Sequence, residues 1–260
     1  MHSSVTLAVD AAASTRYSPA EWQTRVDLAA CYRLMPLYGM SDLVYNHISA
    51  RIPGTEAEFL INPYGFLYEE ITASSLIKID LDGQVLDNPH RDHGVNLAGY
   101  VIHSAVHAAR ADVHCVIHTH SRAGMAVSAM EVGLLPITQT AMRFRDIAYH
   151  DYEGVALELA ERERLVRDLG TEDAMILRSH GLLVASASVA EAFNAMYWLE
   201  MACRAQVDAL SAGTPLIRPS DDVIARTHHV YRPDTIRRFG LMEWPAMLRH
   251  LDRRNPGYAA

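Results

Sequence analysis

The sequence predicts a single α/β domain in which helices pack on a mixed, mostly antiparallel sheet. A length of 260 residues is enough for one domain with a sizeable core but short for two domains. Half of the residues are hydrophobic, as is usual for a globular protein. Helical periodicity and strand-like alternation both occur, but they do not alternate strictly, as a parallel sheet would require. No repeat, low-complexity tract or linker divides the chain. We therefore expect a flexible N-terminus (1–17), one domain (18–213) and a C-terminal extension (214–260).

The first half of the chain begins with a helix and continues with strands. Ser18-Pro19-Ala20-Glu21 is a typical helix start, with Ser as the N-cap and Pro in the first turn, and Gly39 ends this helix. Alternation of apolar and polar residues then predicts strands at 44–52, 58–61, 76–81 and 84–86. A tight Asp82-Gly83 turn joins the last two strands.

The second half adds three more helices around three strands. Apolar spacing predicts a helix at 96–110, and charges at i,i+4 spacing indicate one at 154–169. A capping box at Ser188 opens a further helix, which Gly213 closes. The predicted strands are 113–120, 174–177 and 181–185. Residues 214–260 are punctuated by Pro and Arg and predict no element. We expect them to pack on the domain or on a neighbouring subunit.

Composition excludes several classes of function. The formal net charge of −8 argues against nucleic acid as a partner. The longest stretch without Asp, Glu, Lys or Arg, at 93–109, is too short and too polar to span a membrane, and no signal peptide is visible. Three widely spaced cysteines, Cys31, Cys115 and Cys203, indicate reduced thiols in the cytoplasm.

Lysine chemistry and three common cofactor motifs are also disfavoured. Lys78 is the single lysine among 23 Lys and Arg residues, and it lies in a predicted strand, so a Schiff base is an unlikely electron sink. The chain has no GxGxxG dinucleotide fingerprint, no GxxxxGK phosphate loop and no GxSxG nucleophile elbow. Carbanion chemistry in this protein would therefore need a metal ion.

Histidines supply a candidate metal site. His118 and His120 lie at i and i+2 near the end of a predicted strand, so their side chains point to one face. His180, in a loop and followed by Gly181, is the natural third ligand. Three imidazoles suit one Zn²⁺ ion per chain, with Mn²⁺, Fe²⁺ or Co²⁺ as alternatives. A His-x-His pair alone is a weak signal, because two partly exposed strand histidines give the same pattern.

Other histidines offer rival interpretations. His103 and His107 lie at i and i+4 on a predicted helix, which can clamp a metal, although a hydrogen-bonded helix face explains them as well. His114 shares a strand face with His118 but lies roughly 13 Å from it at the usual strand rise. The polar cluster at 149–152 contains candidate acid/base groups, and a capped loop is its simpler interpretation.

Two motifs together resemble a known family. His118-Thr119-His120, followed later by Arg178-Ser179-His180-Gly181-Leu182, is similar to the class II aldolase/adducin family, which includes fuculose-phosphate aldolase and ribulose-phosphate epimerase. The resemblance covers residues 20–213 and is closest to the adducin head domain. Further matches occur in order at 45–48, 66–68, 72–76, 94–96, 98–99, 103–105, 108–110, 126–130, 133–136 and 149–152.

This resemblance carries several implications. It implies a three-layer α/β/α sandwich and a homotetramer with active sites near subunit boundaries. It assigns His118, His120 and His180 to the family's metal site. It also places Asn46 and Tyr64-Gly65 where the sugar-phosphate enzymes have substrate-binding loops.

The chain departs from the aldolases at the residues that act on phosphorylated sugars. Where those enzymes have Pro-Ser-Ser-Glu, it has Asn96-Leu97-Ala98-Gly99, so the acid/base Glu is replaced by Gly99 and the phosphate-binding serines are missing. The position of the aldolase tyrosine proton donor falls near Thr140. The adducin contacts with actin and spectrin are associated with a lysine-rich tail. This sequence contains a single lysine, so we do not expect actin binding.

These expectations favour a divalent-metal-dependent lyase, of aldolase or decarboxylase type. It would act on a small, non-phosphorylated hydroxy- or keto-acid through a metal-stabilised enediolate. Arg143, Arg145 and Arg178 are candidate partners for a substrate carboxylate, and Tyr149 and His150 are candidate proton-transfer residues. Two alternatives remain open: a non-haem iron oxygenase, and a non-catalytic adducin-like binding or assembly protein.

Overall fold

In the part of the chain that the structure describes, eight strands form one sheet. The structure is a computed structural model that describes residues 16–154 and 161–260. The strand order is β4-β3-β2-β1-β5-β8-β7-β6. Neighbouring strands are antiparallel except β6 and β7, which are parallel. The expected mixed, mostly antiparallel sheet is confirmed.

Most strands lie where the sequence predicts them. They are β1 (His47–Arg51), β2 (Glu58–Ile61), β3 (Ile77–Asp80), β4 (Val85–Asp87), β5 (Cys115–Thr119), β6 (Ala148–His150), β7 (Ala174–Leu177) and β8 (Gly181–Ser186). β1 and β5 are shorter than the predicted strands. The interpretation of 149–152 as a capped loop is wrong for Tyr149 and His150, because they belong to β6. Three residues are too few to show alternation, so this strand depends on its pairing with β7.

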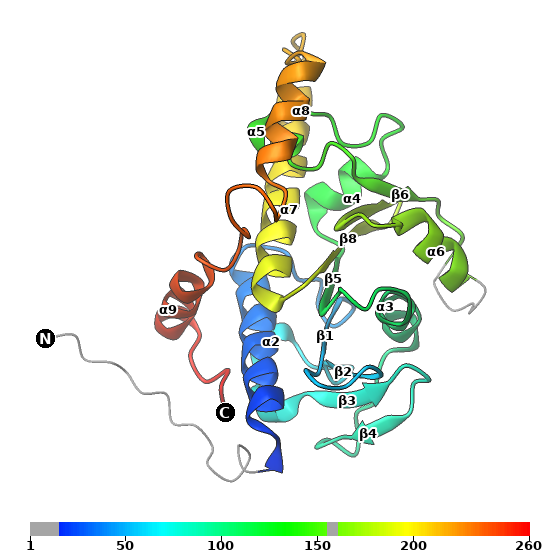
Figure 1. Ribbon diagram of the computed structural model, residues 1–260, viewed down its shortest axis with the longest axis vertical. Coiled ribbons are helices and arrows are strands. Elements are labelled where there is room, and N and C mark those ends of the chain that lie inside the picture. Colours follow the sequence, from blue (N-terminus) through cyan, green and yellow to red (C-terminus); the bar gives the residue numbers. More distant parts are fainter. Residues whose placement is uncertain (1–15, 155–160) are drawn as a thin grey trace, which may run out of the picture.

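Helices cover both faces of the sheet and complete three layers (Figure 1). One face carries α2 (Pro19–Leu37), α4 (Arg122–Ser128) and α7 (Val189–Ser211), and the other carries α3 (Leu97–Ala109) and α6 (Glu161–Leu169). The alternation of side chains along β5 explains why both faces are covered. Cys115 and Ile117 belong to the core under α2 and α7, whereas Val116 belongs to the core under α3 and α6.

The predicted helix starts are confirmed by their caps. The side chain of Ser18 accepts a hydrogen bond from the Glu21 backbone N–H, and that of Ser188 accepts one from the Glu191 N–H. The predicted helix at 154–169 is described from Glu161 onward. The prediction of a flexible terminus at 1–17 lies outside the described residues except for its last two positions.

The C-terminal residues form elements that the sequence did not predict. They are α8 (Asp221–Val230) and α9 (Trp244–Arg254); short helical segments elsewhere are α5 (Gln139–Met142), η1 (Tyr68–Glu70) and η2 (Ala73–Ser75). α9 packs on α2, where the Trp244 indole donates to Asp27 over 2.9 Å. All three cysteines are buried free thiols. In the described part of the chain, no helix combines the length and apolarity that crossing a membrane requires.

Candidate metal centre

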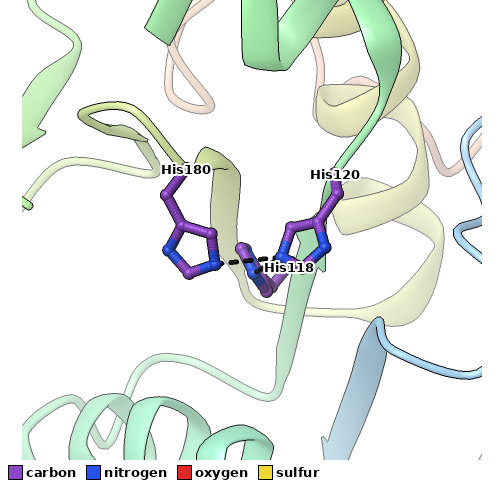
Figure 2. Close-up of side chains that lie close together, drawn as sticks. All are labelled: His118, His120 and His180. Carbon is purple, nitrogen blue, oxygen red and sulfur yellow. Dashed lines mark hydrogen bonds between the residues drawn. The ribbon is translucent and has the colours of Figure 1, made fainter. Parts of the chain in front are cut away.

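Three imidazole rings converge at the end of β5. The Nε2 atoms of His118 and His120 lie 2.9 Å apart, and so do those of His120 and His180. Figure 2 shows the rings turned toward one another. Their centroids lie 4.7–4.8 Å apart. Within residues 16–154 and 161–260, no other group of three or more His, Cys, Asp or Glu side chains gathers so closely. The structure therefore brings together the three residues that the sequence proposed as ligands.

Strand geometry places two of these rings on one side of the sheet. Side chains at i and i+2 of a strand share a face, so His118 and His120 both point away from α7. Thr119 between them points toward α7, where its hydroxyl lies 3.4 Å from the Met196 sulfur. The sequence spacing alone was sufficient to predict this arrangement.

A tight turn between β7 and β8 positions His180. A Cβ atom on Gly181 would lie 2.2 Å from the Thr119 carbonyl oxygen, so a glycine is needed for this turn to approach β5. Ser179 has φ 54°, a left-handed conformation that costs a non-glycine residue on the order of 1 kcal/mol. Strain of this kind is concentrated at functional sites.

The outward-facing nitrogens of two rings have fixed hydrogen-bond acceptors. His118 Nδ1 donates to the Leu182 carbonyl oxygen over 3.0 Å, and His120 Nδ1 donates to the Asp42 carboxylate over 3.0 Å. Because both Nδ1 atoms carry the hydrogen, both Nε2 atoms present lone pairs to each other. Lone pairs at 2.9 Å repel unless a cation or proton lies between them, so this donor set fits a divalent metal ion.

Asp42 is a site residue that the sequence analysis missed. It precedes His120 by 78 residues and lies in the loop between α2 and β1, where no motif marks it. The next residue, Leu43, has φ 47°. Among the described non-glycine residues, only Leu43 and Ser179 have a positive φ. Both strained positions therefore adjoin the histidine cluster.

A chain of hydrogen bonds ties the two segments around His120 to helix α7. The Ser121 hydroxyl donates to the Glu200 carboxylate, which also accepts a hydrogen bond of 2.7 Å from Arg204 Nε. Arg204 in turn donates to the Tyr38 carbonyl oxygen over 2.6 Å, at the start of the loop that carries Asp42. The orientation of His120 is thus fixed from both sides.

We expect an Asp42→Ala substitution to weaken metal binding roughly 10- to 100-fold, because it removes the acceptor that orients His120. Asp42→Asn should lose less, since the amide oxygen can still accept the Nδ1 hydrogen. Competition with a chromogenic chelator measures the affinity. Asp208→Ala, a change at an exposed position of α7, is the control. Equal affinities in Asp42→Ala and the parent would remove Asp42 from the site.

Burial keeps the imidazoles of His118 and His180 in their neutral form. It lowers the pKa of His118, and the neighbouring His180 and His120 lower it further. Burial, followed by the effect of His120, lowers the pKa of His180 to about 4. Both rings are therefore unprotonated at neutral pH, the state in which imidazole binds metals.

Comparison with known proteins identifies the family of this chain. Residues 26–207 match the family model of the class II aldolase and adducin N-terminal domain. The chain belongs to the class II aldolase and adducin family. A protein of Caulobacter vibrioides, provisionally named a class 2 aldolase, is 51% identical over 253 residues, which cover 94% of this chain and 95% of that protein. Mouse alpha-adducin is 47% identical over 204 residues, covering 78% of this chain and 28% of alpha-adducin.

Solved structures of family members have the same fold. An aldolase II superfamily protein from Pseudomonas syringae has a TM-score of 0.89 and 49% identity, covering 95% of this chain and 98% of that one. The L-fuculose 1-phosphate aldolase from Glaciozyma antarctica has a TM-score of 0.79 and 25% identity, with 94% and 98% covered. The resemblance and the three-layer fold inferred from the sequence are confirmed.

The structure explains the glycine where the aldolases have an acid/base Glu. A Cβ atom on Gly99 would lie 2.3 Å from Cδ2 of His47, so the imidazole of His47 fills the space a side chain would need. Asn62 holds this imidazole through a 3.1 Å contact, and burial lowers its pKa to about 4. β1 and α3 therefore pack in a way that excludes a Glu at this position.

The four substrate-binding candidates occupy different environments. Asn46 is fully buried, and neither its amide oxygen nor its amide nitrogen has a hydrogen-bond partner within the described structure. Tyr64 is 39% exposed, and Gly65 lies against His93. Arg178 donates to the Met130 carbonyl oxygen over 2.7 Å. It lines a small cavity together with His150 and His180.

The two proton-transfer candidates are already engaged in other contacts. The Tyr149 hydroxyl accepts a hydrogen bond from the Leu134 N–H over 2.9 Å, and its ring lies under the Arg178 guanidinium. His150 Nδ1 donates to Asp168 over 2.8 Å. Tyr152, which the sequence analysis did not select, is 54% exposed, and its ring centroid is 6.3 Å from that of His180.

The remaining arginine candidates lie elsewhere. Arg145 is exposed and pairs with Asp146 over 3.5 Å. Arg143 lines a separate cavity together with Asp173, at the start of β7, and Glu191, in the first turn of α7. Neither arginine is therefore brought to the histidine cluster.

The rival histidines have a structural role. The Ser49 hydroxyl lies 2.7 Å from His103 Nδ1 and 2.8 Å from His107 Nε2, so it donates to one ring and accepts from the other. Both rings are buried between α3 and β1. His114 is half-buried outside the cluster. The interpretation of His103 and His107 as a hydrogen-bonded helix face is supported.

We expect the buried histidines to make the metal-free protein less stable below pH 6.5. Burial lowers the pKa of His47 to about 4 and that of His107 to about 3, whereas an unfolded histidine titrates near 6.5. In that window the unfolded chain binds more protons, so stability is full above about pH 6.5 and falls as the pH drops. Each histidine contributes a slope of about 1.4 kcal/mol per pH unit.

Urea unfolding between pH 7 and 4 measures this slope. His107→Gln should reduce this slope by the contribution of one histidine, about 1.4 kcal/mol per pH unit. His229→Gln, at an exposed position of α8, should leave the slope unchanged. A free energy of unfolding that stays constant from pH 6.5 to pH 4.5 would contradict the expectation.

Proposed function

We propose that this protein is a divalent-metal-dependent lyase of aldolase or decarboxylase type. The observation on which this proposal rests is the convergence of the three Nε2 atoms of His118, His120 and His180. An ion in this donor set, Zn²⁺ in the first place and otherwise Mn²⁺, Fe²⁺ or Co²⁺, would stabilise negative charge on substrate oxygens while a C–C bond breaks. Three protein ligands leave a coordination position for substrate, as catalytic sites require.

A small hydroxy- or keto-acid without a phosphate group is the proposed substrate. The phosphate-binding serines of the aldolases are absent, and Gly99 packs directly on His47. Asn46 offers a buried amide with both polar atoms unpartnered, beside the strand that pairs with β5. Such a group costs stability unless a ligand satisfies it, so we assign it to substrate binding. Tyr64, Gly65 and Arg178 are proposed to line the same site.

Proton transfer would fall to residues near His180. His150 shares a cavity with His180 and is hydrogen bonded to Asp168, which fixes its tautomer. Tyr149, whose ring lies under the Arg178 guanidinium, is the second proposed proton-transfer residue. Tyr152 is 54% exposed, and its ring centroid lies 6.3 Å from that of His180, so it is a third candidate.

A homotetramer in the cytoplasm is part of this proposal. Large apolar side chains remain exposed on segments next to the histidine cluster: Leu43 (66%), Tyr45 (50%), Leu97 (57%) and Val132 (63%). A neighbouring subunit over these residues would bury them and exclude water from the site. The proposal includes no nucleic acid, membrane or actin partner.

Substrate screening tests the function. Metal-loaded protein is incubated with small hydroxy- and keto-acids, and released aldehyde, keto-acid or carbon dioxide is assayed beside L-fuculose 1-phosphate. We expect cleavage of an acid, loss of activity in His180→Ala, and retained activity in the control His114→Ala. Unchanged activity in His180→Ala would overturn the proposal, and preferred cleavage of the sugar phosphate would overturn its substrate class.

Two other outcomes would favour the alternatives. Oxygen consumption by the Fe²⁺-loaded protein would indicate a non-haem iron oxygenase. A stable oligomer that cleaves no substrate would favour an adducin-like binding or assembly protein, which the similarity to alpha-adducin permits.

A further inference from the structure

A second cavity lies at the opposite end of the sheet from the histidine cluster. Its volume is about 400 Å³, within the range of small-molecule sites. It is lined by the segments that precede β5 and β7, the end of β8, and the segment 231–239 that follows α8. Ser186 pairs with Cys115 at this end, whereas Leu182 pairs with Thr119 at the other, so a strand length of roughly 13 Å separates the two sites.

One guanidinium on the wall of this cavity lacks an acidic partner. Arg143 Nη1 donates to the Asn194 side-chain oxygen over 2.8 Å, and the Arg143 guanidinium lies 5.9 Å from the Tyr231 ring centroid. In the described part of the chain, no carboxylate oxygen lies within the 4.0 Å of an ion pair with it. Burial lowers the pKa of Arg143, so its charge is held in a poorly solvated position.

The other arginines that line the cavity have acidic partners, of which the loosest is Asp234, 3.9 Å from Arg232 Nε. Arg110 pairs with Asp112 through contacts of 2.9 and 2.7 Å. Arg238 pairs with Glu191 through contacts of 2.7 and 2.5 Å. Among the described arginines of the cavity, Arg143 is therefore the one without an acidic partner, and its half-buried guanidinium has donors left for a ligand.

Two carboxylates of the same cavity also lack a basic partner. Glu172 and Asp173, just before β7, form no ion pair with any described residue. Burial raises the pKa of Glu172, and the neighbouring Asp173 raises it further. Asp173 also attracts the charge of Arg143 from beyond contact distance. The cavity thus holds a cation and two anions that form no ion pair with each other, and Arg110, Arg232 and His228 act on the anions only from beyond contact distance.

We propose that this cavity binds a small zwitterion, an α-amino acid with an apolar side chain. Its carboxylate accepts hydrogen bonds from Arg143, and its ammonium group donates to Asp173 and Glu172. The paired rings of Tyr231 and Phe239, 5.0 Å apart, offer an apolar surface for its side chain. An occupant bridges the segment after α8 to the sheet, so binding raises the melting temperature.

Thermal unfolding and calorimetry with L-leucine test this site. Its matched analogues are 4-methylpentanoate, which lacks the ammonium group, and 3-methylbutylamine, which lacks the carboxylate. At millimolar concentration L-leucine should raise the melting temperature, and both analogues should fail. Arg143→Gln and Asp173→Asn should each weaken binding roughly tenfold or more, whereas the exposed neighbour Arg145→Gln should bind as the parent does.

Several results would overturn the assignment. The first is that neither L-leucine nor any other apolar L-amino acid binds. The second is that 4-methylpentanoate binds as tightly as L-leucine. The third is that both Arg143→Gln and Asp173→Asn keep the parental affinity. Asp173→Asn changes an exposed side chain, so it keeps the test decisive if Arg143→Gln fails to fold. Metal content is expected to be unchanged in all variants, so this test stands apart from that of the lyase function.

Discussion

Substitution of His118 by alanine is expected to lower bound metal from about one ion per chain to near zero. The loss removes one of three ligands and also opens a gap beside His120, whose Nε2 lies 2.9 Å from that of His118. With two ligands left, affinity should fall by several orders of magnitude. Elemental mass spectrometry on protein purified without a metal-affinity tag measures the ion content.

The matched control is His114→Ala, which removes an imidazole just before β5 but outside the cluster. It should keep the parental metal content. If the parent binds no metal after incubation with zinc, manganese, iron and cobalt, the histidine cluster is not a metal site. The alternative of a non-catalytic, adducin-like binding or assembly protein would then be favoured.

Restoring a side chain at position 99 is expected to destabilise the fold rather than improve catalysis. The Cβ of a Gly99→Ala variant would lie 2.3 Å from Cδ2 of His47, a buried ring fixed by Asn62. Overpacking of this kind costs roughly 1–3 kcal/mol. Gly99→Glu, which restores the aldolase residue, should cost more, because it also buries a carboxylate. Urea unfolding at neutral pH gives the change in free energy.

Two variants test the cause of this destabilisation. Gly94→Ala adds a methyl group in open space and should leave stability unchanged. His47→Ala combined with Gly99→Ala should recover part of the loss, because the clash is removed and the two changes are coupled. A stable Gly99→Glu protein with raised lyase activity would show that His47 yields, and that the aldolase geometry can be rebuilt.

Local patterns in the sequence were enough for the elements that carry the site. The capping serines at Ser18 and Ser188 predicted where helices begin, because an N-cap is a contact between near neighbours. The period of two along β5 placed His118 and His120 on one face. Three-residue strands such as β6 and the helices α8 and α9 escaped prediction, because contacts with distant segments stabilise them.

The family motifs strengthened the assignment of His180, which the loop ending in Gly181 had suggested but no local pattern connects to β5. They also marked Gly99 as a departure from the aldolases. What they could not provide was the reason, since His47 and Gly99 meet only when β1 and α3 pack together.

The sequence by itself thus determined the sheet type, the helix starts, the family and the three candidate ligands. These features follow from period, capping and short motifs, which act over a few residues. Tertiary structure alone decided that Asp42 orients His120, that Tyr149 is held by a neighbouring loop, and that Arg143 faces a different cavity. The physical reason is that a hydrogen bond or a cavity depends on distances between atoms, and the folded sheet brings together residues that lie far apart in the chain.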